Sequence, residues 1–178
     1  MQNLLDRCAD GRLAASVVGV VSSRPDVLGV DRARRAGVPV VVAEKAGRSE
    51  TAFAAARGWG ADLVVCAGWL HLLKVPPDFR GRVLNVHPSL LPKFGGKGMY
   101  GRHVHEAVLA AGETESGCTV HLLDDTYDTG PVVLQRKVPV LPGDTPETLA
   151  ERVQAAEREA LPEGIRSVLS CSGLKPGG

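Results

Sequence analysis

An asparagine and a histidine stand two residues apart in the apolar run Val83–His87, and Pro88 follows the histidine directly. Because side chains alternate along a β-strand, this spacing turns Asn85 and His87 to the same side. Proline has no N–H group and favours an extended residue before it, so the strand is expected to end here. Both polar groups are therefore predicted at the carboxyl end of a strand, where open α/β sheets bind their ligands.

A third polar group, Asp128, lies in the turn-forming stretch Thr126–Pro131. An amide, an imidazole and a carboxylate together indicate acyl-group chemistry without a protein nucleophile. The Asn85 amide can donate to a carbonyl oxygen as the carbon becomes tetrahedral, which contributes about 3 kcal/mol in comparable sites. The His87 imidazole can pass a proton near neutral pH, and a nearby carboxylate favours its charged form. Spacing alone equally allows a structural role, in which these groups satisfy backbone atoms and support a turn.

Short β-branched runs alternate with helical stretches, a pattern typical of βαβ units. The predicted fold class is therefore α/β, with a Rossmann-like, mostly parallel open sheet and helices on both faces. Ser49 is the expected cap of the helix at residues 49–59, and Pro162 is expected to kink or break the last one. The expected strands are residues 16–22, 38–42, 62–67, 83–87, 117–123 and 131–138. The expected helices are residues 1–8, 27–36, 49–59, 102–111 and about 145–170.

Composition narrows the classes of partner. The chain has 178 residues, a formal net charge of +1 and no basic tract, so neither nucleic acid nor another polyanion is an expected partner. It contains no apolar stretch long enough to span a membrane. Four cysteines without a CxxC pair fit the reducing cytoplasm and argue against a zinc site. His103 and His105 point to different helix faces at their spacing, so no metal is predicted there either.

Three stretches carry a resemblance to a known family: Asn85–Phe94, Gly117–His121 and Asp128–Pro131 closely resemble motifs of the phosphoribosylglycinamide formyltransferase family. The stretch from Gly96 to Ala107 is also similar, and the likeness runs from Met1 to about Leu161. The resemblance implies transfer of a formyl group from 10-formyltetrahydrofolate to the amine of glycinamide ribonucleotide in de novo purine biosynthesis, without a metal. The expected partners are these small molecules, and the sequence leaves monomer and homodimer open.

The same resemblance implies roles for single residues. His87 becomes the catalytic acid, Asn85 binds the formyl oxygen, and Asp128 raises the pKa of His87. His121 becomes a second histidine lining the cleft, although a half-buried strand residue is an equal alternative for it. The peptide bond between Leu91 and Pro92 is expected to be cis.

For the folate, the family uses the loop after the strand at residues 62–67. Arg48 resembles a family arginine that contacts the folate, with a solvated loop charge as the alternative. His71 stands where an arginine is common. Gln154 and Glu157 resemble substrate-side residues, and a spacing of three places them on one helical face. The predicted folate-binding set is Arg48, Leu70, His71, Leu72, Leu73 and Asn85.

The family begins with a strand and a Gly-Ser-Asn loop whose amides bind the substrate phosphate, and Met1 aligns just after that asparagine. We therefore expect residues 1–171 to form a single formyltransferase domain truncated at its amino end, followed by a disordered tail, residues 172–178. Turnover of the ribonucleotide is expected to be weak, with folate binding partly retained. Hydrolysis of 10-formyltetrahydrofolate, or a folate-binding remnant with impaired catalysis, remain the alternatives.

Overall fold

The structure is a computed structural model that describes residues 1–171, so the predicted tail at 172–178 lies outside the described residues. The elements follow the predicted alternation of strands and helices. In order they are α1 Gln2–Ala9, β1 Val20–Ser22, α2 Leu28–Arg35, β2 Val40–Val42, α3 Arg48–Gly58, β3 Val64–Cys66, the 3-10 turn Pro77–Phe79, β4 Val83–His87, α4 Arg102–Ala110, β5 Glu115–Leu122, β6 Val132–Pro139 and α5 Pro146–Cys171.

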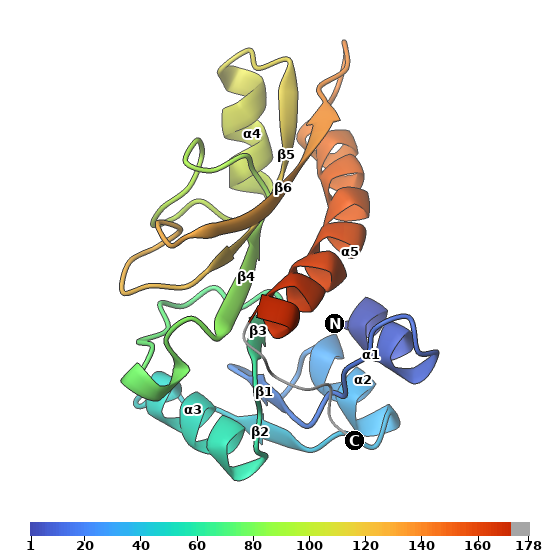
Figure 1. Ribbon diagram of the computed structural model, residues 1–178. Helices are drawn as coiled ribbons and strands as arrows, with labels where there is room; N and C mark the ends of the chain where they lie inside the picture. The colour runs from blue at the N-terminus through green and yellow to red at the C-terminus, as the bar shows by residue number, and fades with distance from the viewer. Residues whose placement is uncertain (172–178) are drawn as a thin grey trace.

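The strands form two groups (Figure 1). In one group β1 pairs parallel with β2, and in the other the order is β3-β4-β5-β6. The pair β3-β4 is parallel, whereas β5 and β6 add antiparallel strands at the far edge. The predicted α/β fold class is confirmed. The antiparallel strands β5 and β6 correspond to the strands predicted at residues 117–123 and 131–138.

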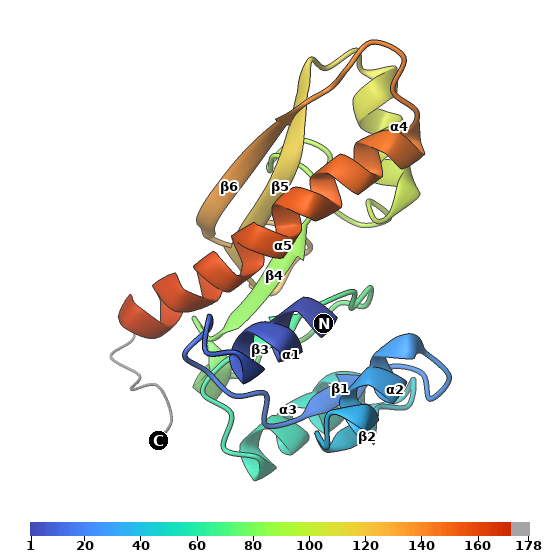
Figure 2. The same ribbon diagram turned by 90° about the vertical axis from the view of Figure 1, so that its right-hand side faces the viewer.

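The two faces of β4 are buried by different helices, as a doubly covered sheet requires. Leu84 is fully buried in a cluster with Leu149 and Val153 of α5. Val83 belongs to a second cluster with Phe53 of α3 and Phe79. Helices on both faces were predicted. Figure 1 shows α5 and α3 on opposite sides of β3 and β4, and Figure 2 shows α5 crossing in front of β4.

The last helix is continuous, and the expected break at Pro162 is wrong. Proline lacks an N–H group, so the carbonyl of Arg158, four residues earlier, has no donor within the helix. The side chain of Asn3 in α1 supplies one, with its Nδ2 donating to the Arg158 oxygen at 2.7 Å. Although α5 has 26 residues, no helix within residues 1–171 is both long and apolar enough to cross a membrane.

Replacing Asn3 by Ala is expected to lower the free energy of unfolding by at least about 1 kcal/mol, because the Arg158 carbonyl then loses its donor and the Arg7 Nε, 2.9 Å from Asn3 Oδ1, loses its acceptor. Urea unfolding measures the change. Gln2→Ala is the matched control, since the Gln2 amide bonds only to the exposed Asp6 one turn away. Equal effects of the two substitutions would show that the contact with Arg158 contributes nothing specific.

The cap of α3 also differs from the prediction. Gly47, with φ of 75°, occupies the N-cap position, where Ser49 was expected. The Ser49 hydroxyl instead accepts a hydrogen bond from the amide of Lys74 at 3.0 Å. Ser49 therefore ties the start of α3 to the end of the loop that follows β3.

Candidate active site

The register of β4 and β5 brings the first polar groups together. Asn85 pairs with His121 and His87 pairs with Thr119, so these side chains share one face of the sheet. The Asn85 amide nitrogen lies 3.2 Å from His121 Nε2. The pairing of β5 with β6 shifts at Val120 and His121. His121 therefore stands beside Asn85 at the carboxyl end of β4.

Asp128 reaches the same point from the loop between β5 and β6. Its Oδ2 lies 3.5 Å from His87 Nδ1, and its Oδ1 lies 3.6 Å from His121 Nε2. The Gly96 amide donates to Oδ2 at 2.9 Å. Four side chains that sequence reasoning selected from three separate stretches therefore form one cluster: Asn85, His87, His121 and Asp128.

The loop that carries Asp128 is fixed by its own polar side chains. Asp124 accepts hydrogen bonds from the Thr126 amide at 2.9 Å and from the Thr129 hydroxyl at 2.8 Å. A side chain at Gly130 would collide with the carbonyl of Leu122, so the loop closes tightly against β5. Asp128 itself has φ of 58°, a left-handed conformation that aspartate tolerates better than most residues. The loop thus holds the carboxylate at the histidines.

The pKa of His87 is governed by burial. Only 3% of the residue is exposed, and burial lowers the pKa of its imidazole below the usual value. The Asp128 carboxylate and the Phe94 carbonyl, which lies 2.8 Å from Nε2, act in the opposite direction. Asp128 therefore raises the His87 pKa as expected, but burial outweighs it and the net shift is downward.

The charge of Asp128 is stable at neutral pH. Burial alone raises its pKa, but contacts with His121, the Gly96 amide and His87 together lower it below the usual value. An ionised carboxylate thus faces both imidazoles. Because each nitrogen of His87 faces an oxygen acceptor, the geometry can stabilise a protonated imidazole when a reaction delivers the proton.

The hydrogen bonds of His121 define how Asn85 is held. His121 is fully buried, and its Nδ1 donates to the carbonyl of Leu122 at 3.0 Å. When this imidazole is neutral, Nε2 carries no proton and can accept one hydrogen of the Asn85 amide; when it is protonated, its charge pairs with Asp128, whose Oδ1 lies 3.6 Å from Nε2. The second amide hydrogen remains available to a carbonyl oxygen. His121 is therefore more deeply buried than the predicted half-buried strand residue, and it also contacts the cluster.

The loop after β4 is pinned by a network that the sequence did not indicate. Thr119 Oγ1 donates to the carbonyl of Ser89 at 2.7 Å and accepts from the amide of Leu91 at 3.0 Å. Gln135 donates to Thr119 Oγ1 and to the Leu91 carbonyl, both at 2.8 Å. The bond from Leu91 to Pro92 is cis, as expected. Thr119 lies in the stretch Gly117–His121 that resembles the family, but its contacts follow only from the register of the strands.

The predicted folate loop lies beside the cluster. The amide of Leu72 donates to the hydroxyl of Tyr127 at 3.0 Å, and Tyr127 is the neighbour of Asp128 in the chain. Leu73 is buried in the core cluster of α3, whereas Leu70 is 55% exposed. The loop is thus anchored at its carboxyl end and open at Leu70.

Two nitrogen donors near this loop are buried without partners. Among the described residues, Arg48 Nε and Trp69 Nε1 find no hydrogen-bond acceptor. Burial and the Arg48 charge, in that order, lower the pKa of His71. The Trp69 and His71 rings form a T-shaped pair with their centroids 6.0 Å apart. Arg48 is therefore not a freely solvated loop charge. Unsatisfied buried donors favour binding of an acceptor-rich ligand.

Gln154 and Glu157 lie apart from the cluster. Gln154 lines a small cavity of about 150 Å³ between α4 and α5, together with His105. Glu157 is half-buried, and its charge adds to burial in raising the pKa of the Cys118 thiol. The Cys118 side chain faces α5, on the opposite side of β5 from His121. Sequence reasoning did not select His105, which is buried; burial, and after it the nearby His87, lower the pKa of its imidazole.

Burial raises the pKa of Glu157 to about 7. Below pH 4.5 the Glu157 carboxyl is protonated in both the folded and the unfolded chain, so its ionisation does not lower the free energy of unfolding. As the pH rises toward 7, only the unfolded chain loses the proton, and the folded state loses stability. Glu157→Gln is therefore expected to gain about 1–3 kcal/mol relative to the parent between pH 5 and pH 8. Chemical unfolding at both pH values tests this, with exposed Glu151→Gln as the control; a pH-independent difference would contradict it.

The cluster lacks an activated nucleophile. Burial raises the pKa of Cys118 to about 12, and the hydroxyl of Ser89 donates to the Lys93 carbonyl at 2.6 Å. Within residues 1–171 no three His, Cys, Asp or Glu side chains are grouped to hold a metal ion. What remains is an amide donor, an imidazole and a carboxylate around one point, which suits a group transfer in which one substrate attacks the other directly.

An α/β domain with this cluster at the carboxyl edge of its central strand defines the class of formyl transferases. The family model described as formyl transferase matches residues 1–165, and the chain belongs to this family. The chloroplastic phosphoribosylglycinamide formyltransferase of Arabidopsis thaliana is 41% identical over 170 residues, which covers 90% of this chain and 58% of the relative. The earlier resemblance is confirmed.

Other relatives also support membership of this family. The trifunctional purine biosynthetic protein adenosine-3 of Drosophila pseudoobscura pseudoobscura is 39% identical over 180 residues, or 96% of this chain, but the chain spans only 13% of that protein's length. The crystal structure of glycinamide ribonucleotide transformylase 1 from Symbiobacterium toebii superposes with a TM-score of 0.85 at 39% identity. That match covers 93% of this chain and 79% of the other.

Proposed function

We propose that this chain transfers the formyl group of 10-formyltetrahydrofolate to the amine of glycinamide ribonucleotide, a step of purine biosynthesis. The single observation that supports this most is the convergence of Asn85, His87 and Asp128 around one point at the carboxyl end of β4. The relatives named as phosphoribosylglycinamide formyltransferases support the choice of substrates. The roles of the residues below are part of the proposal.

In the proposed reaction the substrate amine attacks the formyl carbon, a new carbon–nitrogen bond forms, and the bond from that carbon to folate N10 breaks. The free hydrogen of the Asn85 amide donates to the formyl oxygen as it gains negative charge. The amine loses one proton and N10 gains one. His87 carries that proton, and Asp128 stabilises the imidazole while it is charged.

The folate is proposed to lie along Leu70–Leu73, next to Asp128, with Arg48 and His71 toward its negative end. The orphaned Arg48 Nε supports this assignment, because a carboxylate there would satisfy it. On the ribonucleotide side we propose His121, Gln154 and Glu157. For Glu157 this requires the substrate to pass over the strand edge, since Glu157 lies on α5, which packs against the face of β5 opposite to His121.

We also infer a reducing compartment, the cytoplasm, from four cysteines that stay unpaired. Monomer and homodimer both remain compatible with the proposed reaction. Equilibrium ultracentrifugation distinguishes them.

The test of the function uses 10-formyltetrahydrofolate labelled in the formyl carbon. The enzyme is in excess, so that even a slow single turnover is detected. Transfer of label to the ribonucleotide supports the proposal. Release of formate in the absence of ribonucleotide would instead identify a hydrolase. Binding of a folate analogue without either product would identify a folate-binding remnant.

A further inference from the structure

One side chain connects the loop that carries Asp128 to the loop after β3. Tyr127 precedes Asp128 in the chain, and its hydroxyl accepts a hydrogen bond from the amide of Leu72 at 3.0 Å. The two bonded residues are 55 positions apart, and their loops follow different strands, β3 and β5. This bond therefore joins the segment proposed to hold the folate directly to the segment that holds the Asp128 carboxylate.

The backbone at Asp128 depends on its neighbours. Its φ of 58° is a left-handed conformation, which persists in a residue other than glycine when surrounding contacts hold it. Of the two adjacent side chains, Thr129 bonds inside the loop, to Asp124 at 2.8 Å, whereas Tyr127 bonds outside it. The bonds of Asp124 thus fix the shape of the loop, and the bond of Tyr127 fixes where the loop lies.

The position of the carboxylate is sensitive to small movements. Asp128 Oδ2 lies 3.5 Å from His87 Nδ1, and Oδ1 lies 3.6 Å from His121 Nε2. Strong charge-assisted hydrogen bonds between nitrogen and oxygen measure about 2.7–2.9 Å. Both contacts are longer than that, so a shift of the loop by a few tenths of an ångström decides whether they tighten or are lost.

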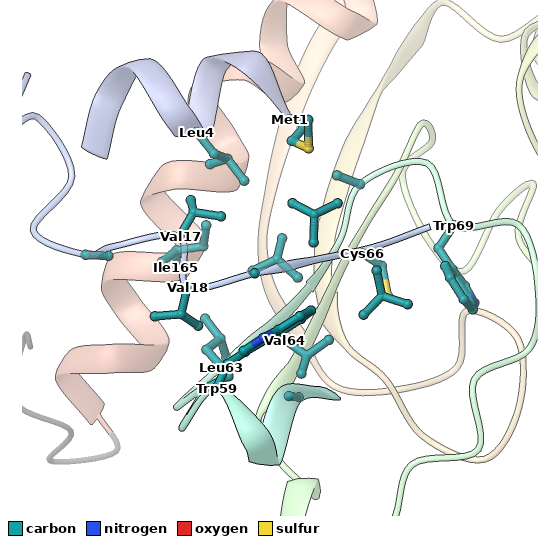
Figure 3. Close-up of a pocket in the computed structure, with 18 of the residues that line it drawn as sticks. Met1, Leu4, Val17, Val18, Trp59, Leu63, Val64, Cys66, Trp69 and Ile165 are labelled. Carbon is teal, nitrogen blue, oxygen red and sulfur yellow. The ribbon is translucent and has the colours of Figure 1, made fainter. Parts of the chain in front are cut away.

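The loop after β3 is less firmly packed where it begins. Residues 67–69 line a cavity of about 550 Å³ that is also lined by residues of β1 and β3, and Figure 3 shows Trp69 at one end of this space, beyond Cys66. One side of this stretch therefore has few side chains packed against it. The bond from the Leu72 amide to Tyr127 fixes the second half of the loop, close to where a ligand on the loop would lie.

We propose that Tyr127 is a positioning residue for the formyl transfer, whose hydroxyl sets Asp128 against His87 when the loop at Leu72 is in its folate-binding position. The inference rests on the proposed function for the identity of the ligand. Tyr127 itself touches no reacting atom and acts through Asp128. Because coupling between two sites is reciprocal, an ordered Asp128 loop should also favour folate binding.

The state of His87 reports where Asp128 lies. Titratable groups face His87 from three elements: Asp128 from its loop, His121 from β5 and His105 from α4. Among these three, only Asp128 is ionised as an anion. Displacement of its carboxylate therefore leaves burial unopposed by that charge, and the pKa of His87 falls further below its usual value.

The first test needs no turnover. Tyr127→Phe keeps the ring and removes the hydroxyl, and the histidine titrations are followed by NMR with a folate analogue bound. His87 is expected to titrate at lower pH than in the parent, in the same direction as in Asp128→Asn, while the exposed His103 titrates unchanged. Hydrogen exchange at the Leu72 amide should be at least about 10-fold faster. Unchanged values for His87 would overturn the inference.

The second test separates positioning from binding. At saturating folate, Tyr127→Phe is expected to lower the single-turnover rate about 10-fold, with a rise of only a few-fold in the Kd of the analogue. In an Asp128→Asn background the same change should alter the rate by less than about two-fold, because its effect passes through Asp128. Equal effects in both backgrounds, or a full rate at saturation, would overturn the inference.

The matched control is Tyr100→Phe. Tyr100 is 46% exposed, and its ring contacts His103 at the surface. This substitution should change neither the His87 titration nor the rate when each protein is measured well below its Tm. A parent chain without formyl transfer would count against the proposed function, whereas the NMR titration would still decide whether Tyr127 positions Asp128.

Discussion

Asn85→Ala is expected to lower kcat/KM for formyl transfer by roughly 10²–10³-fold, the loss seen when one donor to a developing oxyanion is removed. The Asn85 amide is held by His121 Nε2 at 3.2 Å, which leaves its second hydrogen free. Negative charge develops on the formyl oxygen mainly in the transition state. The loss should therefore fall on the rate, while the Kd for a folate analogue changes by only a few-fold.

The measurement is single-turnover formyl transfer together with calorimetric folate binding. Asn3→Ala is the matched control, because it removes an amide that bonds to the Arg158 carbonyl and lies in α1. That control should lower stability and leave the transfer rate unchanged below its unfolding temperature. A rate for Asn85→Ala within a few-fold of the parent would exclude Asn85 as the oxyanion donor.

Asp128→Asn is expected to lower kcat by about 10²-fold and to move one limb of the pH profile. The substitution keeps the size of the side chain and suits the left-handed backbone at this position. It removes the negative charge 3.5 Å from His87 Nδ1. Because that charge raises the His87 pKa against burial, its loss lowers the pKa further. The limb governed by His87 should therefore shift to lower pH.

The pH dependence of single-turnover transfer, measured from pH 5 to 9, gives both the rate and the position of the limb governed by His87. Asp125→Asn is the control, since Asp125 is exposed and its carboxylate lies 3.6 Å from Arg80. It should alter neither the rate nor the profile. A slower Asp128→Asn enzyme with an unmoved profile would mean that Asp128 only shapes the loop.

Part of the site could be predicted because its geometry depends only on residues that are neighbours in the sequence. The alternation of a strand and one proline suffice to place Asn85 and His87 on one side at the end of β4, and the boundaries Val83–His87 are those predicted. Asp128 could be selected from its turn-forming stretch but not placed in space, and His121 joined the set only through resemblance. The contact between Asn85 and His121 depends on the register of β4 against β5, which no local pattern specifies.

The remaining differences come from contacts between distant parts of the chain. Pro162 does not break α5 because Asn3, in another helix, supplies the missing donor. Ser49 does not cap α3 because its hydroxyl bonds to Lys74. The net pKa shift of His87 is downward because tertiary packing buries the imidazole, and sequence spacing carries no measure of burial.

The central claim is that His87, positioned by β4 and faced by Asp128, moves the proton of a direct formyl transfer. The most direct measurement compares the parent chain and His87→Ala in single-turnover transfer of labelled formyl from 10-formyltetrahydrofolate to glycinamide ribonucleotide. We expect labelled formylated ribonucleotide from the parent and a rate at least about 10²-fold lower for His87→Ala. Equal rates for the two proteins would contradict it.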